Sequence, residues 1–138
     1  LTVLTTLYLR RIVKLSRWMD RAVEVARTST GTKKVGAVLT KNGKFVSESP
    51  NFATKSHPQQ SYYAKKVGQP RRIYLHAEQS ALIRARSDAD TIYVARLGAK
   101  GDLRLSKPCS VCMAAIKELT NIKTIWYTDK GNWVKVEV

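Results

Sequence analysis

Two short motifs hold the side chains that are best suited to chemistry. In the segment YLHAEQSALIRA, residues 74–85, His76 and Glu78 lie two positions apart at the start of an apolar helical repeat. The segment KPCSVCMAAI contains Cys109 and Cys112, the only cysteines of the sequence. Each motif alone has an ordinary explanation, because a carboxylate suits the first turn of a helix and a close cysteine pair also serves redox chemistry.

Taken together, the two motifs predict a metal site. Two thiolates and an imidazole form a nitrogen and sulfur set that favours zinc, and three protein ligands leave the fourth tetrahedral position for water. A cysteine pair at a spacing of three that opens a helix places both sulfurs on one turn, where the first amides lower the pKa of a thiol. His76 supplies the third ligand if its helix begins at the same spot.

Glu78 then has a chemical role. From a first helical turn beside the metal, its carboxylate can take a proton from the water and pass it to a leaving group. H-x-E followed by P-C-x-x-C is the pattern of zinc deaminases, in which hydroxide attacks a ring carbon and ammonia departs. A thiol redox pair, the alternative interpretation, explains neither His76 nor Glu78.

Apolar periodicity and turn residues predict the elements that position these motifs. An amphipathic pattern indicates a first helix, Asn-Gly in KNGK is a strong hairpin signal, and Pro108 suits the start of a helix. We expect helices at about Arg10–Ser29 and 108–119, and a short entry followed by a helix within 73–86. We expect strands near Val35–Thr40, Lys44–Glu48 and 90–97, a turn at 98–107, and two strands around DKGN within 122–138.

The order is α, ββ, loop, α, β, α, ββ, which predicts an α/β fold in α-β-α layers. We expect a mixed five-stranded sheet flanked by helices, whose last two strands form an antiparallel hairpin. The length of 138 residues fits a single domain, with residues 1–9 interpreted as a peripheral N-terminal extension. The chain opens on Leu1 instead of Met, so Leu1 need not be the native start.

The charge favours an anionic partner. Lys and Arg total 25 against 10 acidic residues, a formal net charge of +15. The basic residues are dispersed, which suits a groove that tracks phosphates and favours nucleic acid or a nucleotide. A generally basic surface, or a docking face for an acidic protein, is the alternative. The sequence has no long apolar run and no secretion signal, so we expect a cytoplasmic protein without membrane contact.

The chain resembles the cytidine and deoxycytidylate deaminase superfamily, which includes free nucleoside deaminases, tRNA adenosine deaminases and polynucleotide cytidine deaminases. The resemblance runs from TSTGTKKVGAVLTKNGKFVSESPN through LHAEQSAL and TIYVARL to KPCSVC. It implies a cytidine-deaminase-like fold and Zn²⁺ as cofactor. It also implies that His76, Cys109 and Cys112 are the zinc ligands and that Glu78 is the proton shuttle.

The resemblance implies two substrate contacts as well. Asn51 ends the second strand, where many relatives place an asparagine that contacts the sugar, although an asparagine after proline is also an ordinary turn residue. The amide of Ala77 corresponds to the group with which relatives hydrogen-bond the base.

Departures from the family pattern favour cytosine over adenine. A direct final hairpin is similar to free cytidine deaminases, whereas tRNA adenosine and deoxycytidylate deaminases place a helix between those strands. The loop before HAE offers only His57 as an extra metal ligand, and deoxycytidylate enzymes often carry more. The segment KSHPQQSYYAKKVGQPRRIYLHAE is similar to poorly characterised deaminases of phages and some protists.

The polar segment Asn51–Arg72 is expected to be a partly helical loop near the site mouth. Its aromatic and basic residues could follow a single strand, or the aromatics could form a local core. The candidates for contacts with phosphate or nucleic acid are His57, Tyr62, Tyr63, Lys65, Lys66, Arg71 and Arg72.

The sequence therefore predicts a zinc-dependent deaminase that converts cytosine to uracil in a nucleotide or in single-stranded DNA or RNA. A tRNA-type adenosine deaminase and a non-catalytic zinc-containing nucleic-acid-binding module are the alternatives. Relatives commonly form dimers or tetramers, so a homo-oligomer is expected.

Overall fold

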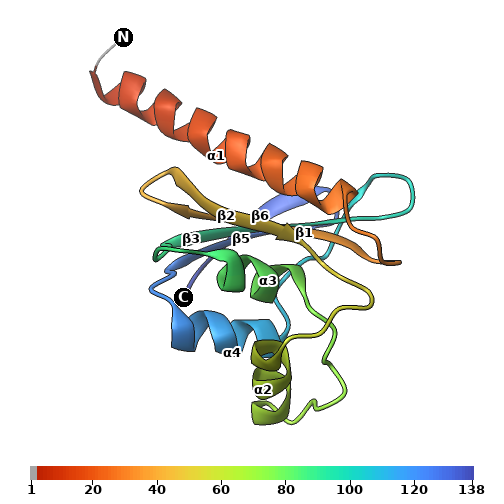
Figure 1. Cartoon of the computed structure of the whole chain (residues 1–138). Coiled ribbons are helices and arrows are strands. Elements are labelled where there is room, and N and C mark those ends of the chain that lie inside the picture. The colour runs from red at the N-terminus through yellow and green to blue at the C-terminus, as the bar shows by residue number, and fades with distance from the viewer. Residues whose placement is uncertain (1–2) are drawn as a thin grey trace.

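A mixed sheet of six strands separates two layers of helices (Figure 1). The computed structural model describes residues 3–138, with side chains from residue 15 onward. The elements in chain order are α1 (Val3–Arg27), β1 (Lys34–Lys41), β2 (Lys44–Pro50), α2 (Pro58–Lys66), α3 (Ala77–Arg84), β3 (Thr91–Leu97), β4 (Leu103–Arg104), α4 (Ser110–Leu119), β5 (Thr124–Asp129) and β6 (Asn132–Glu137).

The sheet has the strand order β2-β1-β3-β5-β6, and the short β4 pairs with β3 outside this path. Strands β3 and β5 are parallel, while β1 runs antiparallel to both β2 and β3. The last two strands form an antiparallel hairpin, as the sequence predicted. Thr124 pairs with Glu137 in this hairpin. The apolar run VGAVL in β1 is buried because helices cover both faces of the sheet there.

Helix α1 packs alone on one face of the sheet (Figure 1). Its buried Trp18, Ala22 and Val25 contact Val38 and Tyr93 of the central strands. The helix lies so close to β1 that a Cβ on Gly36 would sit 2.4 Å from the backbone nitrogen of Ala26. Glycine at this position therefore sets the distance between helix and sheet.

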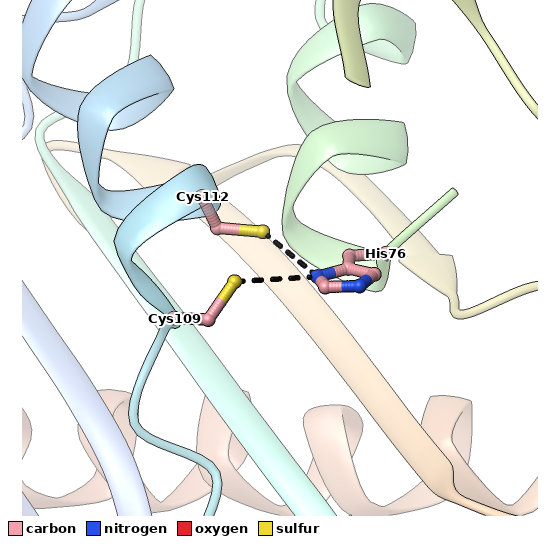
Figure 2. A group of neighbouring side chains, drawn as sticks. All are labelled: His76, Cys109 and Cys112. Carbon is pink, nitrogen blue, oxygen red and sulfur yellow. Dashed lines mark hydrogen bonds between the residues drawn. The ribbon is translucent and has the colours of Figure 1, made fainter. Parts of the chain in front are cut away.

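Helices α3 and α4 cover the opposite face, and α2 packs outside them against α4 (Figure 1). Ala77 and Ala81 of α3 and Ile116 of α4 pack on Leu39 and Ile92 of the sheet. The small alanines let α3 approach the sheet closely, and the N-termini of α3 and α4 lie side by side on this face of the sheet (Figure 2).

The structure changes two of the expected elements. Helix α1 begins at Val3 rather than near Arg10, because Leu and Arg favour helix in this stretch. The expected extension at 1–9 therefore lies partly in α1 and partly outside the described residues. The expected turn at 98–107 contains β4, which makes the sheet six-stranded instead of five-stranded. The partly helical loop expected at 51–72 has α2 as its helical part. No described helix is long and apolar enough to cross a membrane.

Candidate active site

The two chemical motifs meet at two helix N-termini. His76 is the N-cap residue of α3 and Cys109 is the N-cap residue of α4, with Cys112 one turn further along. An N-cap side chain often accepts a hydrogen bond from its own helix, but neither His76 nor Cys109 does so. Both side chains point instead toward the other helix, as Figure 2 shows.

The three side chains have the separations of a zinc ligand set. His76 Nδ1 lies 3.3 Å from Cys112 Sγ and 3.5 Å from Cys109 Sγ. All three ligand atoms lie within 4.8 Å of one another. Zinc bonds of about 2.0–2.1 Å to nitrogen and 2.3 Å to sulfur at a tetrahedral angle require about 3.6 Å between these atoms. The residues present therefore fit Zn²⁺, which is the cofactor of this site.

The cysteine pair is already partly ionised by its own contacts. A hydrogen bond from the Cys112 thiol lowers the pKa of Cys109 to about 3, and the same bond raises the pKa of Cys112. The hydrogen bond with Cys109 raises the pKa of His76. Cys109 is therefore a thiolate at neutral pH. A bound divalent cation would supply the positive charge that stabilises Cys112 as a second thiolate.

Glu78 lies in the first turn of α3 and faces the same pocket. Glu78 is only 5% exposed. Burial raises the pKa of Glu78, because the charged carboxylate loses its hydration. A carboxyl group in this environment can hold a proton and release it, which is the property required of a general acid and base.

A buried glutamine of α2 fixes the backbone just before α3. Gln60 Oε1 accepts a hydrogen bond of 3.3 Å from the backbone N–H of His76, and Gln60 Nε2 donates one of 3.0 Å to the carbonyl of Arg72.

A serine fixes the segment before the cysteine motif. The hydroxyl of Ser106 donates to the carbonyl of Val94 at 2.6 Å and accepts from the N–H of Thr128 at 2.7 Å. The segment leading to Cys109 is thereby tied to β3 and β5.

His76 and Cys109 line a pocket of about 450 Å³, while Cys112 is fully buried beside them. We call it the active-site pocket, and Ala77 and Asn51 line it together with Glu78. Ala77 is the first residue of α3, so its backbone N–H has no acceptor within the helix and is free for a ligand. This position suits the base contact that the resemblance implied.

Asn51 is held through one end of its amide. Its Oδ1 accepts a hydrogen bond of 3.2 Å from the backbone N–H of Val35 and a second one from the hydroxyl of Ser29. With Oδ1 engaged, Nδ2 is the end that can donate to a molecule in the active-site pocket. The asparagine is thus both a structural link and a potential contact.

The other expected contacts divide into two groups. Arg71 and Arg72 line the active-site pocket. The remaining candidates are not among its lining residues. His57 caps α2 by accepting from the N–H of Gln59, and Lys66 pairs with Glu118. Tyr63 is a core residue that is 3% exposed and packs edge-on against Tyr62, and both Tyr62 and Lys65 lie on the exposed part of α2.

Several pocket residues were not among the site residues expected from the motifs. Tyr74, which is 54% exposed, and Leu105 lie at the pocket. Three further cations also line it: Lys33, Arg96 and Lys107. Tyr74 and Lys107 are the first residues of the two segments that contain the motifs, which is a signal in the sequence, whereas Arg96 is brought to the pocket by strand pairing.

Comparison with known proteins agrees with this geometry. Residues 12–128 match the family model described as the cytidine and deoxycytidylate deaminase zinc-binding region. The comparison with curated proteins found no match. The matched range includes both helix N-termini, the three ligands and Glu78. The chain therefore belongs to the cytidine and deoxycytidylate deaminase family and carries its zinc-binding region.

Proposed function

We propose that this zinc deaminase converts cytosine to uracil in a nucleotide or in single-stranded nucleic acid. The observation that carries the proposal is that His76 and Cys109, which cluster with the fully buried Cys112, line a pocket that the buried Glu78 also lines. A metal whose only purpose was structural would not require an acid in the same pocket.

The reaction needs water, a proton shuttle and a site for the base. Zinc with three protein ligands supplies Lewis acidity that makes a water nucleophilic near neutral pH. Glu78 takes a proton from the attacking water and delivers it to the departing amine. A bond from oxygen to C4 of cytosine forms and the bond from C4 to the amine nitrogen breaks, so ammonia leaves and the base, still attached to its sugar, becomes uracil.

The protein backbone and Asn51 orient the substrate in this proposal. The N–H of Ala77 donates to an acceptor on the base, because it sits beside the ligands at the start of α3. Nδ2 of Asn51 donates to the sugar, since its Oδ1 is already occupied by Val35 and Ser29. These contacts hold C4 toward the metal ligands and Glu78.

The preference for cytosine rests on the last hairpin. Strands β5 and β6 are antiparallel and are joined directly after Asp129. This arrangement is similar to free cytidine deaminases and differs from the helix-connected strands of tRNA adenosine deaminases. A tRNA-type adenosine deaminase is the second candidate, since the same zinc chemistry removes ammonia from adenine.

The test is to incubate the zinc-loaded protein with cytidine, dCMP, a cytosine-containing single-stranded oligonucleotide and an adenosine-containing tRNA stem-loop. Chromatography of the products should detect uracil from at least one cytosine substrate and no inosine. Inosine in place of uracil would contradict the choice of base. The absence of any product from protein that holds one zinc per chain would favour a non-catalytic binding module.

A further inference from the structure

We propose that the active-site pocket and a neighbouring groove form one basic track for the backbone of a single-stranded nucleic acid. The groove, which we call the Lys34 groove, is lined by Lys33, Lys34, Arg96 and Arg104. Lys33 and Arg96 also line the active-site pocket, so the two cavities are contiguous. The inference rests on the proposed function for its target base and adds the substrate class to it.

All but one of the cations along this track have no ion-pair partner, unlike several cations elsewhere. Among the side chains of residues 15–138, ion pairs within 4.0 Å involve Arg21, Arg27, Lys66, Arg104 and Lys135. Of these, only Arg104 belongs to the track, where it pairs with the exposed Asp102. The track cations without such a pair are Lys33, Lys34, Arg71, Arg72, Arg96 and Lys107.

Two arginines face each other at the junction of the two cavities. Arg96 of β3 and Arg104 of β4 are direct partners in the antiparallel pairing. Like charges opposite one another destabilise a strand pair, and an anion between or beside them relieves the repulsion. Asp102 offsets the charge of Arg104 at 2.6 Å but leaves that of Arg96 uncompensated.

Acidic residues are scarce along the track. Among the residues whose side chains the structure describes, Glu78 is the only acid lining the active-site pocket, and none lines the Lys34 groove. One phosphate monoester would be served by two or three cations at the pocket. Six unpaired cations over two contiguous cavities match several successive phosphates, which a polymer has and a free nucleotide lacks.

A single strand fits the track better than a duplex. The target base must reach Glu78, which is 5% exposed, and a paired and stacked base cannot do so without being extruded. Tyr74 is exposed beside Arg72 at the pocket, where an unpaired neighbouring base can stack on its ring. Single-strand sites commonly combine a positive groove with such an aromatic side chain.

The test uses a fluorescently labelled, cytosine-containing single-stranded 15-mer and the zinc-loaded protein. Fluorescence anisotropy measures the binding affinity at several salt concentrations. The logarithm of the affinity should fall with the logarithm of salt with a slope of about −3, since at least four phosphates contribute about 0.7 each. Unlabelled dCMP should compete at least about 100-fold more weakly than the unlabelled 15-mer.

Lys34→Gln and Lys44→Gln make a matched pair of variants. Lys34 lies in the groove at the start of β1. The exposed Lys44 is the first residue of β2 and pairs with Lys41, at the opposite end of β1. Lys34→Gln should weaken oligonucleotide binding several-fold and flatten the slope by about 0.7, while Lys44→Gln should match the unchanged protein. Equal effects of both variants, or competition by dCMP as strong as by the oligonucleotide, would overturn the track. A duplex of the same sequence that binds as tightly as the single strand would overturn it too.

The binding assay also separates the two proposals. Strong, salt-dependent binding without any uracil formation would leave the track in place and refute the deamination of cytosine. Uracil formation from dCMP without oligonucleotide binding would support the proposed chemistry and refute the track.

Discussion

Gln60 Oε1 accepts a hydrogen bond from the backbone N–H of His76, across 16 residues of sequence, and so connects helix α2 to a metal ligand. The same side chain donates to the carbonyl of Arg72, and Gln60 is fully buried. One amide therefore fixes both the start of α3 and the position from which Arg72 lines the active-site pocket. Helix α2, which contributes none of the pocket-lining residues, acts on the site through this contact.

Gln60→Met should weaken zinc binding by about 10-fold to 100-fold, the usual cost of losing a group that orients a ligand. Methionine has a similar shape but cannot accept from His76 or donate to Arg72. Competition with a chelator of known affinity measures the change. Lys65→Gln, on the exposed part of the same helix, is the control and should bind zinc normally. Equal zinc affinity of all three proteins would remove the positioning role of Gln60.

His76→Ala and Cys112→Ser should each reduce zinc from one ion per chain to a small fraction of that, because two ligands cannot hold the ion tightly. Removal of zinc should also lower the Tm. Metal at about 1,000 times its Kd contributes about 4 kcal/mol to stability, or about 10 °C for a domain of this size. Elemental analysis and calorimetry make these measurements.

Ser110→Ala is the matched control for the ligand variants. Ser110 lies between the two cysteines, but its hydroxyl accepts from Gln69 instead of facing the ligands. This variant should keep one zinc per chain. Full zinc content in Cys112→Ser would contradict the ligand assignment.

Asn51→Asp should retain the fold and lose activity. Aspartate keeps an oxygen to accept from Val35 and Ser29, but it lacks the Nδ2 donor and adds a negative charge beside the substrate. Asn51→Ala should lose activity and also about 1 kcal/mol of stability for each lost hydrogen bond. Turnover is measured with the best cytosine substrate, and chemical denaturation gives the free energy of unfolding. Together the two measurements distinguish Asn51→Asp from Asn51→Ala. Normal turnover by Asn51→Asp would confine this residue to a structural role.

Gly36→Ala should destabilise the protein by about 3 kcal/mol, because a new methyl group has no room against rigid backbone. Its Cβ would lie 2.4 Å from the nitrogen of Ala26 and 2.6 Å from the carbonyl oxygen of Ala22. Gly31→Ala is the control, since its nearest neighbour would be the Cβ of Ala53 at 3.4 Å. Urea unfolding should separate the variants clearly, and similar midpoints would show that α1 can move away from the sheet.

The cluster of His76, Cys109 and Cys112 could be predicted from sequence because local rules place these residues. The apolar repeats, and Pro108 two residues before α4 begins, locate the starts of the two helices closely, and the residue types at those positions define the donor set. The final hairpin was also predictable, since DKGN is a turn signal: Lys130 and Gly131 adopt positive φ there.

The rest of the site depends on contacts between distant segments. Arg96 reaches the pocket because β3 pairs with β1 on one side and with β4 on the other. The residues next to Arg96 in the sequence do not indicate that it lies at the pocket. Tyr63 was a candidate for stacking, yet it packs under α4 with Ala64 and Val111, a preference that composition alone does not reveal. Gln60 looks like an ordinary polar helix residue until its two partners are known.

The most direct test of the central claim is uracil formation by Glu78→Gln compared with the unchanged protein, with zinc measured in both. Glutamine keeps the size of the side chain but cannot shuttle a proton, so zinc should remain at one ion per chain while turnover falls by at least about 100-fold. Turnover by Glu78→Gln equal to that of the unchanged protein, at equal zinc content, would contradict the account.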